Sequence, residues 1–267
     1  TTETSGFEIS GEGATELSHG KDNLIYSAFS FPFKNLGIPV PEIAISCYNK
    51  IPIGRGLGSS SASIIAGLLA ANQLCGNRYT NEDILTFATD IEGHSDNASA
   101  ALLGGLQIVL KSTDGIFTST VTIPTMLRAV IFIPDQPVDT RDARSLLVSS
   151  VKRNDAVFNM SRVALLINGM STGNLSLLKT GTEDRLHQQA REKIFPAMKP
   201  IIKAALDSGA FGAFLSGSGS AILALAKDRH MTIGYEMAEA ASKSGVSGHF
   251  EITGPSVKGA QIEVDSR

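Results

Sequence analysis

A glycine- and serine-rich stretch places the strongest constraint on how this chain can fold. Residues 50–67 read KIPIGRGLGSSSASIIAG, and an alanine-rich, mostly apolar run follows over residues 62–74. Glycines allow positive φ angles and a close approach of a ligand to the main chain. The first turn of a helix offers free N–H groups at the positive end of its dipole. The pattern therefore predicts a loop that enters a helix and binds an anion, most often phosphate; the alternative is a turn that only caps a core helix.

Two common phosphate-binding patterns are absent from this loop. It contains no G-x-x-x-x-G-K-[ST] sequence, and its third glycine comes too early for G-x-G-x-x-G. The three serines that follow the glycines can cap the helix or bind a phosphate-bound Mg²⁺. The pattern that the loop does match is P-x-x-x-G-L-G-S-S-[SA]-A, which begins at Pro52 and ends at Ala62.

The composition limits the classes of protein to consider. The chain has 267 residues, of which 42% are hydrophobic and 18% charged, which is typical of a globular protein with one large or two modest domains. A net charge of −3 without a Lys/Arg run argues against a nucleic-acid partner. No apolar stretch reaches the roughly 20 residues of a membrane helix, so we expect no membrane partner. Cys47 and Cys75 lie in apolar surroundings without metal-ligand spacing, which favours buried thiols, a reducing compartment and a cytoplasmic location without a signal segment.

Hydrophobic periodicity and turn residues predict the secondary structure. Helices are expected over residues 22–30, 62–74, 98–103, 140–148, 155–170, 184–193, 196–208 and 233–244, and one more is opened by a Thr80–Asp83 capping box. Strands are expected over residues 7–9, 39–49, 106–110, 119–123, 129–133, 211–216, 221–226 and 260–264. In the helix over 155–170, the apolar stripe comprises Val157, Phe158, Val163, Leu166 and Ile167. Because helices and strands mix without strict alternation, the fold class is α+β.

The segment EGHSDN, residues 92–97, places several functional side chains between two apolar segments. A carboxylate near a phosphate loop suits Mg²⁺, which binds one or two carboxylates together with phosphate oxygens and water. Asp96 is suited to pair with an ammonium group of a small polar ligand. The alternative is a polar connector with an Asx-turn at Asp96.

Two arginines and a second glycine-rich turn complete the candidates. Arg144 and Arg191 can each clamp a carboxylate with parallel hydrogen bonds, although a helical arginine is more often a solvated surface residue. The sequence GSGS at residues 217–220 separates two strands that are rich in small residues. It is either a flexible hairpin tip or a nest of backbone N–H groups that approaches a ligand.

Taken together, these stretches resemble the homoserine kinases, a family within the GHMP kinase superfamily. PIGRGLGSSSA resembles the superfamily's second motif, and FLSGSGSAILAL resembles its third. EGHSDNASAALLGG is similar to the family pattern EGHPDNVAPALLGG, with Ser95 in place of proline. DTRDARSLL and DRLHQQAREKIFP resemble two further family segments. The matches are collinear and cover nearly the whole chain.

The resemblance implies a two-lobed GHMP kinase fold. An ATP-binding lobe like domain 2 of ribosomal protein S5 is expected at residues 1–126, and a ferredoxin-like α/β-plait lobe at residues 127–267. The implied reaction is ATP-dependent phosphorylation of the L-homoserine hydroxyl to O-phospho-L-homoserine in threonine biosynthesis, catalysed by a homodimer. The alternatives are another GHMP small-molecule kinase and an inactive nucleotide-binding fragment.

The resemblance also assigns roles to individual residues. It implies Ser59 and Glu92 as ligands of Mg²⁺, Asn97 beside the reacting hydroxyl, and catalysis by Asn97 and Arg191 through positioning, without a catalytic base. The homoserine-binding residues would be His94, Asp96, Thr140, Arg144 and Arg191. The ATP-binding residues would be Asn23, Pro52, Ile53, Gly54, Arg55, Gly56, Leu57, Gly58, Ser59, Ser60, Ser61 and Ala62.

One part of the family pattern has no match. The first motif, of the type P-A-T-x-A-N-L-G-x-G-F-D, is missing, and the chain begins with Thr1. In the family this motif supplies an Asn and an Asp to the substrate pocket and a strand to the first lobe. We therefore expect that residues upstream of Thr1 are missing from this sequence.

Overall fold

The computed structural model describes residues 6–137 and 140–264, without the side chains of residues 140–142. Its internal contacts divide the chain into two compact units. Unit 1 comprises the described residues up to Ile53, Gly58–Thr120 and those from Ser256 onward, and unit 2 comprises Gly54–Leu57 and Val121–Pro255. The sequence led us to expect a division into residues 1–126 and 127–267. Relative to that division, four loop residues and residues 121–126 belong to unit 2, and the C-terminal segment belongs to unit 1.

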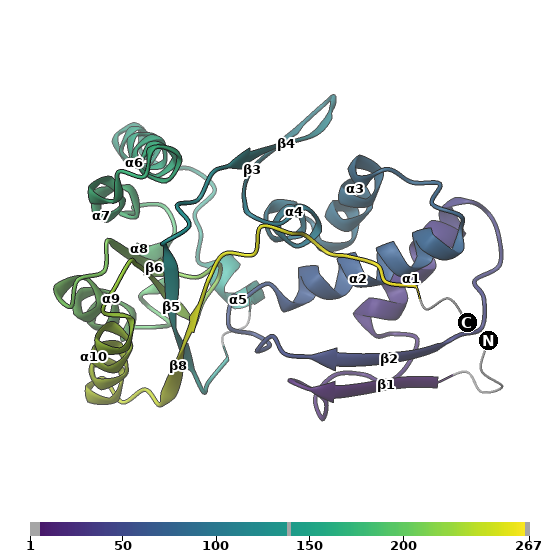
Figure 1. Ribbon diagram of the computed structural model, residues 1–267, viewed down its shortest axis with the longest axis horizontal. Helices are drawn as coiled ribbons and strands as arrows, with labels where there is room; N and C mark the ends of the chain where they lie inside the picture. Colours follow the sequence, from purple (N-terminus) through teal and green to yellow (C-terminus); the bar gives the residue numbers. More distant parts are fainter. Residues whose placement is uncertain (1–5, 138–139, 265–267) are drawn as a thin grey trace. The chain divides into compact units, whose positions relative to one another are not determined.

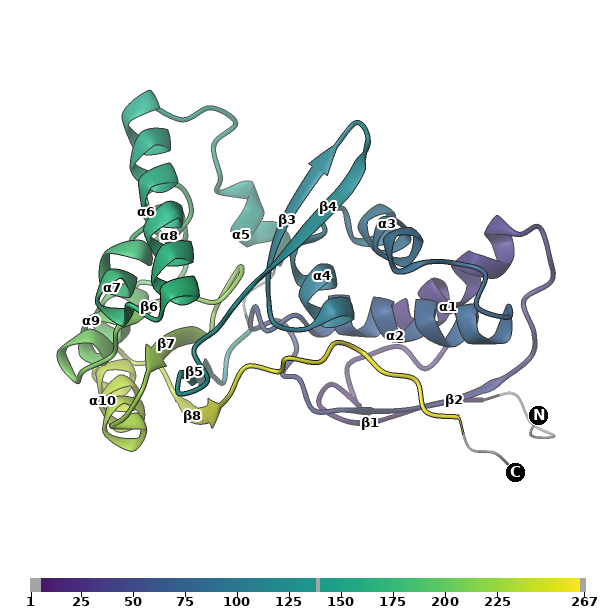
Figure 2. The same ribbon diagram turned by 45° about the horizontal axis from the view of Figure 1, so that its top comes forward.

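Two long helices form the centre of unit 1. Helices α1 (Leu24–Asn35) and α2 (Ser59–Leu74) lie side by side (Figures 1 and 2). Gly67 permits this approach, because a Cβ atom there would lie 2.5 Å from the carbonyl oxygen of Ile25. Helices α3 (Asn81–Glu92) and α4 (Asp96–Leu103) also pack against α2. The apolar core between these helices consists of Ala28, Ile64, Ile65, Leu68, Ile84, Leu85, Ala88, Ala98 and Leu102.

The capping box that the sequence predicted for α3 is confirmed. The Thr80 hydroxyl accepts a hydrogen bond from the N–H of Asp83 at 3.2 Å, and the Asp83 carboxylate accepts one from the N–H of Thr80 at 2.9 Å. Helix α3 ends at Glu92, and Gly93 follows with a φ of 85°. The sequence therefore fixes both ends of the helix that carries Glu92.

The strands of unit 1 form two small sheets. β1 (Gly6–Gly11) and β2 (Ala44–Asn49) run parallel, and β3 (Leu106–Ser112) pairs with β4 (Gly115–Val121). The strand predicted over residues 260–264 is wrong, because this segment joins no sheet of the described residues. Instead it begins beside α4, where the N–H of Ala260 donates to the carbonyl oxygen of Ala101 at 2.9 Å (yellow in Figure 1).

A four-stranded antiparallel sheet organises unit 2. Its strands lie in the order β6-β7-β5-β8, and helices α9 and α10 pack against it. The bounds are β5 (Arg128–Pro134), α9 (Met198–Asp207), β6 (Gly212–Leu215), β7 (Ile222–Ala226), α10 (His230–Lys243) and β8 (Gly248–Thr253). This βαββαβ order is ferredoxin-like, as expected for the second lobe. The hairpin of β6 and β7 was predicted, whereas β8 was not.

Further helices lie between β5 and α9 in the chain. They are α5 (Thr140–Ser145), α6 (Arg153–Thr172), α7 (Leu178–Gly181) and α8 (Gln188–Arg191), with a 3₁₀ turn at Leu175–Leu177. The helix predicted over residues 184–193 is wrong in extent, because only its middle is helical and a turn at Asp184 precedes it.

The apolar stripe predicted for α6 is wrong for two of its members. The exposed fractions are 53% for Val157 and 56% for Val163, whereas Phe158 is half-buried. Helix α6 carries apolar side chains on more than one face, and the side that packs against α7 is fixed by the buried Gly169 and Met170.

The two cysteines of the chain form no disulfide. Cys47 and Cys75 are free and half-buried rather than fully buried, and burial raises the pKa of both thiols. In the part of the chain that the structure describes, no helix has both the length and the apolar character that crossing a bilayer requires.

Candidate active site

The first half of the glycine-rich loop is anchored within unit 2 by Arg55. Its Nε donates to the carbonyl oxygen of Pro134 at 3.1 Å, and a second guanidinium nitrogen donates to that of Asp135. The carbonyl oxygen of Arg55 accepts a hydrogen bond from the N–H of Ala221 at 3.1 Å. The guanidinium predicted to belong to a nucleotide site therefore ties the loop to the end of β5.

Gly56 packs directly against the second glycine-rich turn. The Ser216 hydroxyl donates to the carbonyl oxygen of Gly56 at 2.9 Å. A Cβ atom on Gly56 would lie 2.0 Å from the carbonyl oxygen of Ser216 and 2.8 Å from the backbone nitrogen of Gly219, and its φ is +72°. Only glycine fits such a position without displacing backbone. The turn at residues 217–220 is thus a packed support of the loop rather than a free hairpin tip.

The second half of the loop opens helix α2 in unit 1. Gly58 occupies the N-cap position with a φ of 80°, and no side chain caps the helix. The main-chain N–H groups of the first turn, in a helix of 16 residues, therefore present donors and the positive end of a dipole. A Cβ atom on Gly58 would meet only Asn97, at 3.9 Å. This start of a helix has the properties of a phosphate cradle.

Glu92 joins this cradle through two serine hydroxyls. The Ser60 and Ser61 hydroxyls each donate to one carboxylate oxygen of Glu92 at 2.5 Å. Ser61 is fully buried, Ser60 is exposed, and the Glu92 side chain is 8% exposed. The sequence led us to expect Ser59 with Glu92 as metal ligands, whereas the hydroxyls bonded to Glu92 belong to the next two serines. Ser59 as a ligand stays a prediction.

The donor set at Glu92 fits a hard cation such as Mg²⁺. Carboxylate and hydroxyl oxygens are ligands that Mg²⁺ accepts, and it keeps further positions for phosphate oxygens and water. Among the described residues, no group of three or more His, Cys, Asp or Glu side chains could hold a metal ion alone. A metal at Glu92 would therefore take its remaining ligands from hydroxyl, water or ligand oxygens.

His94, Asp96 and Asn97 follow Glu92 closely in space as well as in sequence. A ring nitrogen of His94 lies 2.8 Å from a carboxylate oxygen of Asp96, and its other ring nitrogen lies 4.0 Å from Glu92. The same Asp96 oxygen accepts a hydrogen bond from the N–H of Asn97 at 2.7 Å. The Asp96 side chain is 70% exposed, so it is accessible to a cationic ligand while His94 holds it in place.

Arg191, in unit 2, is a charged residue of the candidate set that is buried. It is 8% exposed, and one terminal nitrogen donates to the carbonyl oxygen of Gly217 at 3.0 Å. Its Nε is buried without a hydrogen-bond partner among the described residues. Burial lowers the pKa of this guanidinium, Asp184 raises it, and nearby Arg144 lowers it again. A buried guanidinium with an unpartnered donor beside a second cation can bind an anion.

The other candidates lie as follows. Arg144 is exposed on α5. Thr140 is the first residue of that helix, and its side chain lies outside the described residues. Asn23 is buried and caps α1: its side-chain oxygen accepts from the N–H of Ile25 at 2.8 Å, and its amide donates to Ser18 at 2.7 Å. Contact between Asn23 and adenine stays a prediction.

Asp184 and Gln188 were not among the functional residues predicted from the sequence. The Asp184 carboxylate accepts a hydrogen bond from the N–H of Gln188 at 2.6 Å, and the Gln188 side chain accepts one from the N–H of Leu215 at 3.0 Å. Asp184 stands four residues before the first residue of α8, whose N-cap is His187, so the usual capping signal does not identify it.

Comparison with known families gives matches in both units. The model of the GHMP kinases N terminal domain matches residues 23–105, and the model of the GHMP kinases C terminal domain matches residues 163–231. The first match contains the glycine-rich loop together with Glu92, His94, Asp96 and Asn97, and the second contains Arg191.

Individual proteins of similar sequence or structure also match most of this chain. A homoserine kinase of Caldanaerobacter subterraneus is 41% identical over 81% of this chain and 70% of its own length. A homoserine kinase of Desulfitobacterium hafniense is 34% identical over 95% of this chain and 86% of its own length. The crystal structure of a homoserine kinase from Cytophaga hutchinsonii superposes with a TM-score of 0.83 at 30% identity, covering 97% of this chain and 85% of that one.

Proposed function

The chain belongs to the homoserine kinase family of the GHMP kinases, and we propose that it transfers the γ-phosphoryl group of ATP to the side-chain hydroxyl of L-homoserine. The product is O-phospho-L-homoserine, an intermediate of threonine biosynthesis. ATP, when bound, supplies the phosphoryl group and leaves as ADP. The residues of this chain bind, orient and neutralise charge, which is the main protein contribution to phosphoryl transfer.

The start of α2 is the proposed triphosphate cradle. It has no side-chain cap, and its N-cap glycine leaves the first N–H groups accessible. Arg55 and Gly56, which precede this helix, are held by hydrogen bonds within unit 2, and contact between Arg55 and ATP stays a prediction. A bound polyphosphate would satisfy main-chain donors that no side chain satisfies.

We further propose that Mg²⁺ is held by the Glu92 carboxylate and the Ser60 hydroxyl. Ser60 is the exposed member of the two serines bonded to Glu92. Buried Ser61 would keep the second carboxylate oxygen in place. Its hydrogen bond fixes the carboxylate orientation, which is how residues around a metal site tune its ligands.

The buried, partly unpartnered guanidinium of Arg191 is the observation that best supports an amino-acid substrate. A buried guanidinium with an unpartnered Nε is costly unless an anion completes its hydrogen bonds. A carboxylate meets a guanidinium through two parallel bonds. We propose that Arg191, with Arg144, binds the α-carboxylate of homoserine, that Asp96 binds its ammonium group, and that Asn97 lies beside its hydroxyl.

No described side chain of the candidate set stands out as a general base. The arginines of the set do not accept protons. The proposal therefore keeps catalysis by positioning, with the hydroxyl proton passing to the transferred phosphoryl group. We retain a homodimer as a prediction from the resemblance and a cytoplasmic location as a prediction from the sequence.

The test is a substrate panel with the purified chain, ATP and MgCl₂. ADP release is measured in a coupled assay and the phosphorylated product by ³¹P NMR. The acceptors are L-homoserine, 3-aminopropan-1-ol (which lacks the carboxylate), galactose and mevalonate. We expect kcat/KM for L-homoserine to exceed that for 3-aminopropan-1-ol by about 100-fold, since a charge-assisted pair contributes roughly 1.5–3 kcal/mol.

Two outcomes would contradict the proposal in different ways. Faster turnover of galactose or mevalonate would indicate another GHMP small-molecule kinase. Nucleotide binding without turnover of any acceptor would indicate an inactive nucleotide-binding protein.

A further inference from the structure

The turn before α8 is built around the carboxylate of Asp184. This carboxylate accepts hydrogen bonds from the N–H groups of Leu186 at 3.1 Å, His187 at 2.8 Å and Gln188 at 2.6 Å. His187 is the N-cap of α8 and Gln188 its first residue, so the Asp184 carboxylate holds the backbone of the turn that leads into the helix. Burial alone would raise the pKa of Asp184, but these hydrogen bonds and one from Asn159 outweigh it and lower the pKa.

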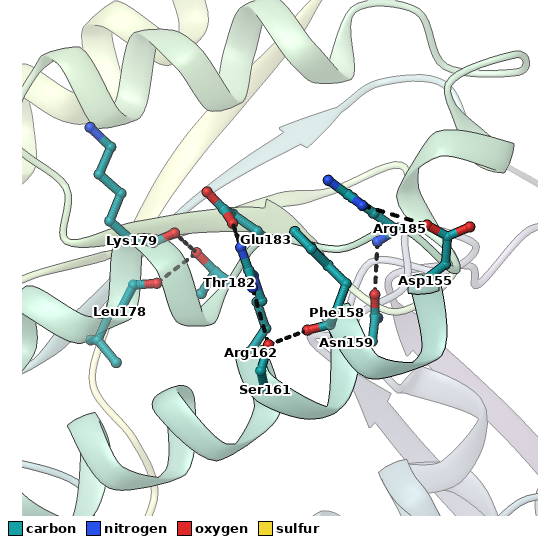
Figure 3. Close-up of polar contacts among 10 residues, drawn as sticks. All are labelled: Asp155, Phe158, Asn159, Ser161, Arg162, Leu178, Lys179, Thr182, Glu183 and Arg185. Carbon is teal, nitrogen blue, oxygen red and sulfur yellow. Dashed lines mark hydrogen bonds and ion pairs between the residues drawn. The ribbon is translucent and has the colours of Figure 1, made fainter. Parts of the chain in front are cut away.

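Asn159 on α6 ties this turn to a long helix. Its amide nitrogen donates to Asp184 at 2.6 Å, and its side-chain oxygen accepts a hydrogen bond from the N–H of Arg185 at 3.0 Å. Figure 3 shows Asn159 pointing from α6 toward Arg185. One side chain therefore fixes both the carboxylate and the backbone of the turn.

A cation–π stack holds the same turn beside Asn159. The Arg162 and Arg185 guanidinium carbons lie 3.5 Å and 3.8 Å from the ring centroid of Phe158 (Figure 3). Arg162 also donates to one Glu183 oxygen from two nitrogens, at 3.1 Å and 3.0 Å. A guanidinium nitrogen of Arg185 lies 3.6 Å from a carboxylate oxygen of Asp155. These contacts attach residues 183–185 to α6.

Helix α8 leads from this attachment to the buried arginine. It has four residues, which is too few for a helix to be stable on its own. Its first residue, Gln188, bonds to the N–H of Leu215, and its last, Arg191, bonds to the carbonyl oxygen of Gly217. The direction of Arg191 therefore depends on how firmly the start of α8 is held.

We propose that Asp184 and Asn159 are positioning residues, which hold α8 so that Arg191 is oriented to bind the substrate carboxylate. This inference rests on the proposed function. Neither residue has to touch the substrate. Asp184 also supplies negative charge that favours the cationic form of Arg191. Loss of either residue should weaken binding of the amino-acid substrate and leave ATP binding unchanged.

The experiment compares Asp184→Asn and Asn159→Ala with Met160→Ala. Met160 is the next residue on α6, and its exposed fraction is 64%, so its replacement controls for changes in the helix. KM for L-homoserine should rise about 10-fold in each of the first two variants, the effect of roughly one hydrogen bond. KM for ATP should stay within about twofold of the unaltered chain, because the altered contact acts on the amino-acid substrate and not on the nucleotide.

A second measurement does not depend on turnover. Hydrogen exchange at the N–H groups of Leu186, His187 and Gln188 should accelerate about 10-fold in Asp184→Asn and remain unchanged in Met160→Ala. An equal rise in KM for ATP would indicate a general structural role and overturn the inference. So would an unchanged KM for homoserine in both variants. Absence of homoserine turnover in the unaltered chain would instead overturn the proposed function.

Discussion

Glu92 in unit 1 and Asp184 in unit 2 are both well-bonded carboxylates, but their partners differ in kind. Glu92 accepts hydrogen bonds from the side-chain hydroxyls of Ser60 and Ser61. Asp184 accepts them from three backbone N–H groups and an Asn amide. The exposed Ser60 hydroxyl can rotate and bond to water instead, whereas a backbone N–H cannot leave its acceptor unless the turn opens.

The difference separates two kinds of work. A carboxylate held by hydroxyls can take up a metal ion while the fold around it stays in place. A carboxylate held by backbone donors fixes the fold itself, and it acts on a ligand only through residues further along the chain. The kind of donor at a carboxylate thus indicates which changes should affect chemistry and which should affect placement or stability.

Replacing Glu92 by Gln should give the largest effect. The amide keeps the shape of the side chain and loses the charge that a metal requires, so kcat should fall roughly 10²–10³-fold, the cost of losing one main electrostatic contact. Steady-state kinetics at saturating MgCl₂ measures this, with the exposed Glu82→Gln on the same helix as the control. Activity of the Gln variant within about fivefold of the unaltered chain would remove Glu92 from the metal site, given the size of such contacts.

Replacing Arg191 by Lys should give the next largest effect. Lysine keeps the charge but cannot form two parallel bonds to a carboxylate, so KM for L-homoserine should rise about 30-fold, equivalent to roughly 2 kcal/mol. Turnover of 3-aminopropan-1-ol, which has no carboxylate, should change little. If kcat/KM falls equally for both acceptors, Arg191 does not bind the carboxylate of the substrate.

Serine replacements sharpen the comparison at Glu92. Ser60→Ala should lower kcat about 10-fold if its hydroxyl shares a cation with Glu92, which is the upper range for one lost contact of this kind. Ser59→Ala should have a smaller effect, because the Ser59 hydroxyl is not among those bonded to Glu92. A titration of activity with MgCl₂ for both variants distinguishes them. The reverse order would restore Ser59 as the metal ligand.

The smallest expected effect is the contribution of the Asp184 carboxylate to the pH dependence of the free energy of unfolding. Its folded pKa lies below the unfolded value of 3.8, so the ionised form stabilises the fold. That contribution is complete above pH 3.8 and is lost as the pH falls through the folded pKa. Urea unfolding of the unaltered chain and Asp184→Asn should therefore show a difference that narrows below pH 3.8. A constant difference would show that the carboxylate charge is not involved.

Local patterns predicted local structure well. The Thr80–Asp83 capping box, the hairpin of β6 and β7, and the loop that opens α2 all depend on residues within a few positions of each other. Glu92 beside the phosphate loop was also predicted, although through Ser59 rather than through Ser60 and Ser61. The start of α2 places three consecutive serines near the proposed phosphate site. Which of their hydroxyls bond to Glu92 depends on how α3 packs against α2.

The errors arose where a pattern had more than one physical outcome. Val157 and Val163 fit an inward stripe on α6, but the helix has apolar residues on several sides and α7 selects one of them. Residues 260–264 alternate as a strand does, yet a strand also needs a neighbour with free hydrogen-bonding groups. Arg191 could not be distinguished from a surface arginine, because its burial depends on contacts with Gly217 that are distant in sequence.

The placement of Gly54–Leu57 has a consequence for protein engineering. These four residues form part of unit 2 although the chain on either side of them belongs to unit 1. A chimera made by a single crossover near residue 121 would therefore pair a foreign loop with the native carbonyl groups of Pro134 and Asp135. Exchange of the second lobe between related kinases should succeed more often when Arg55 and its neighbours travel with it.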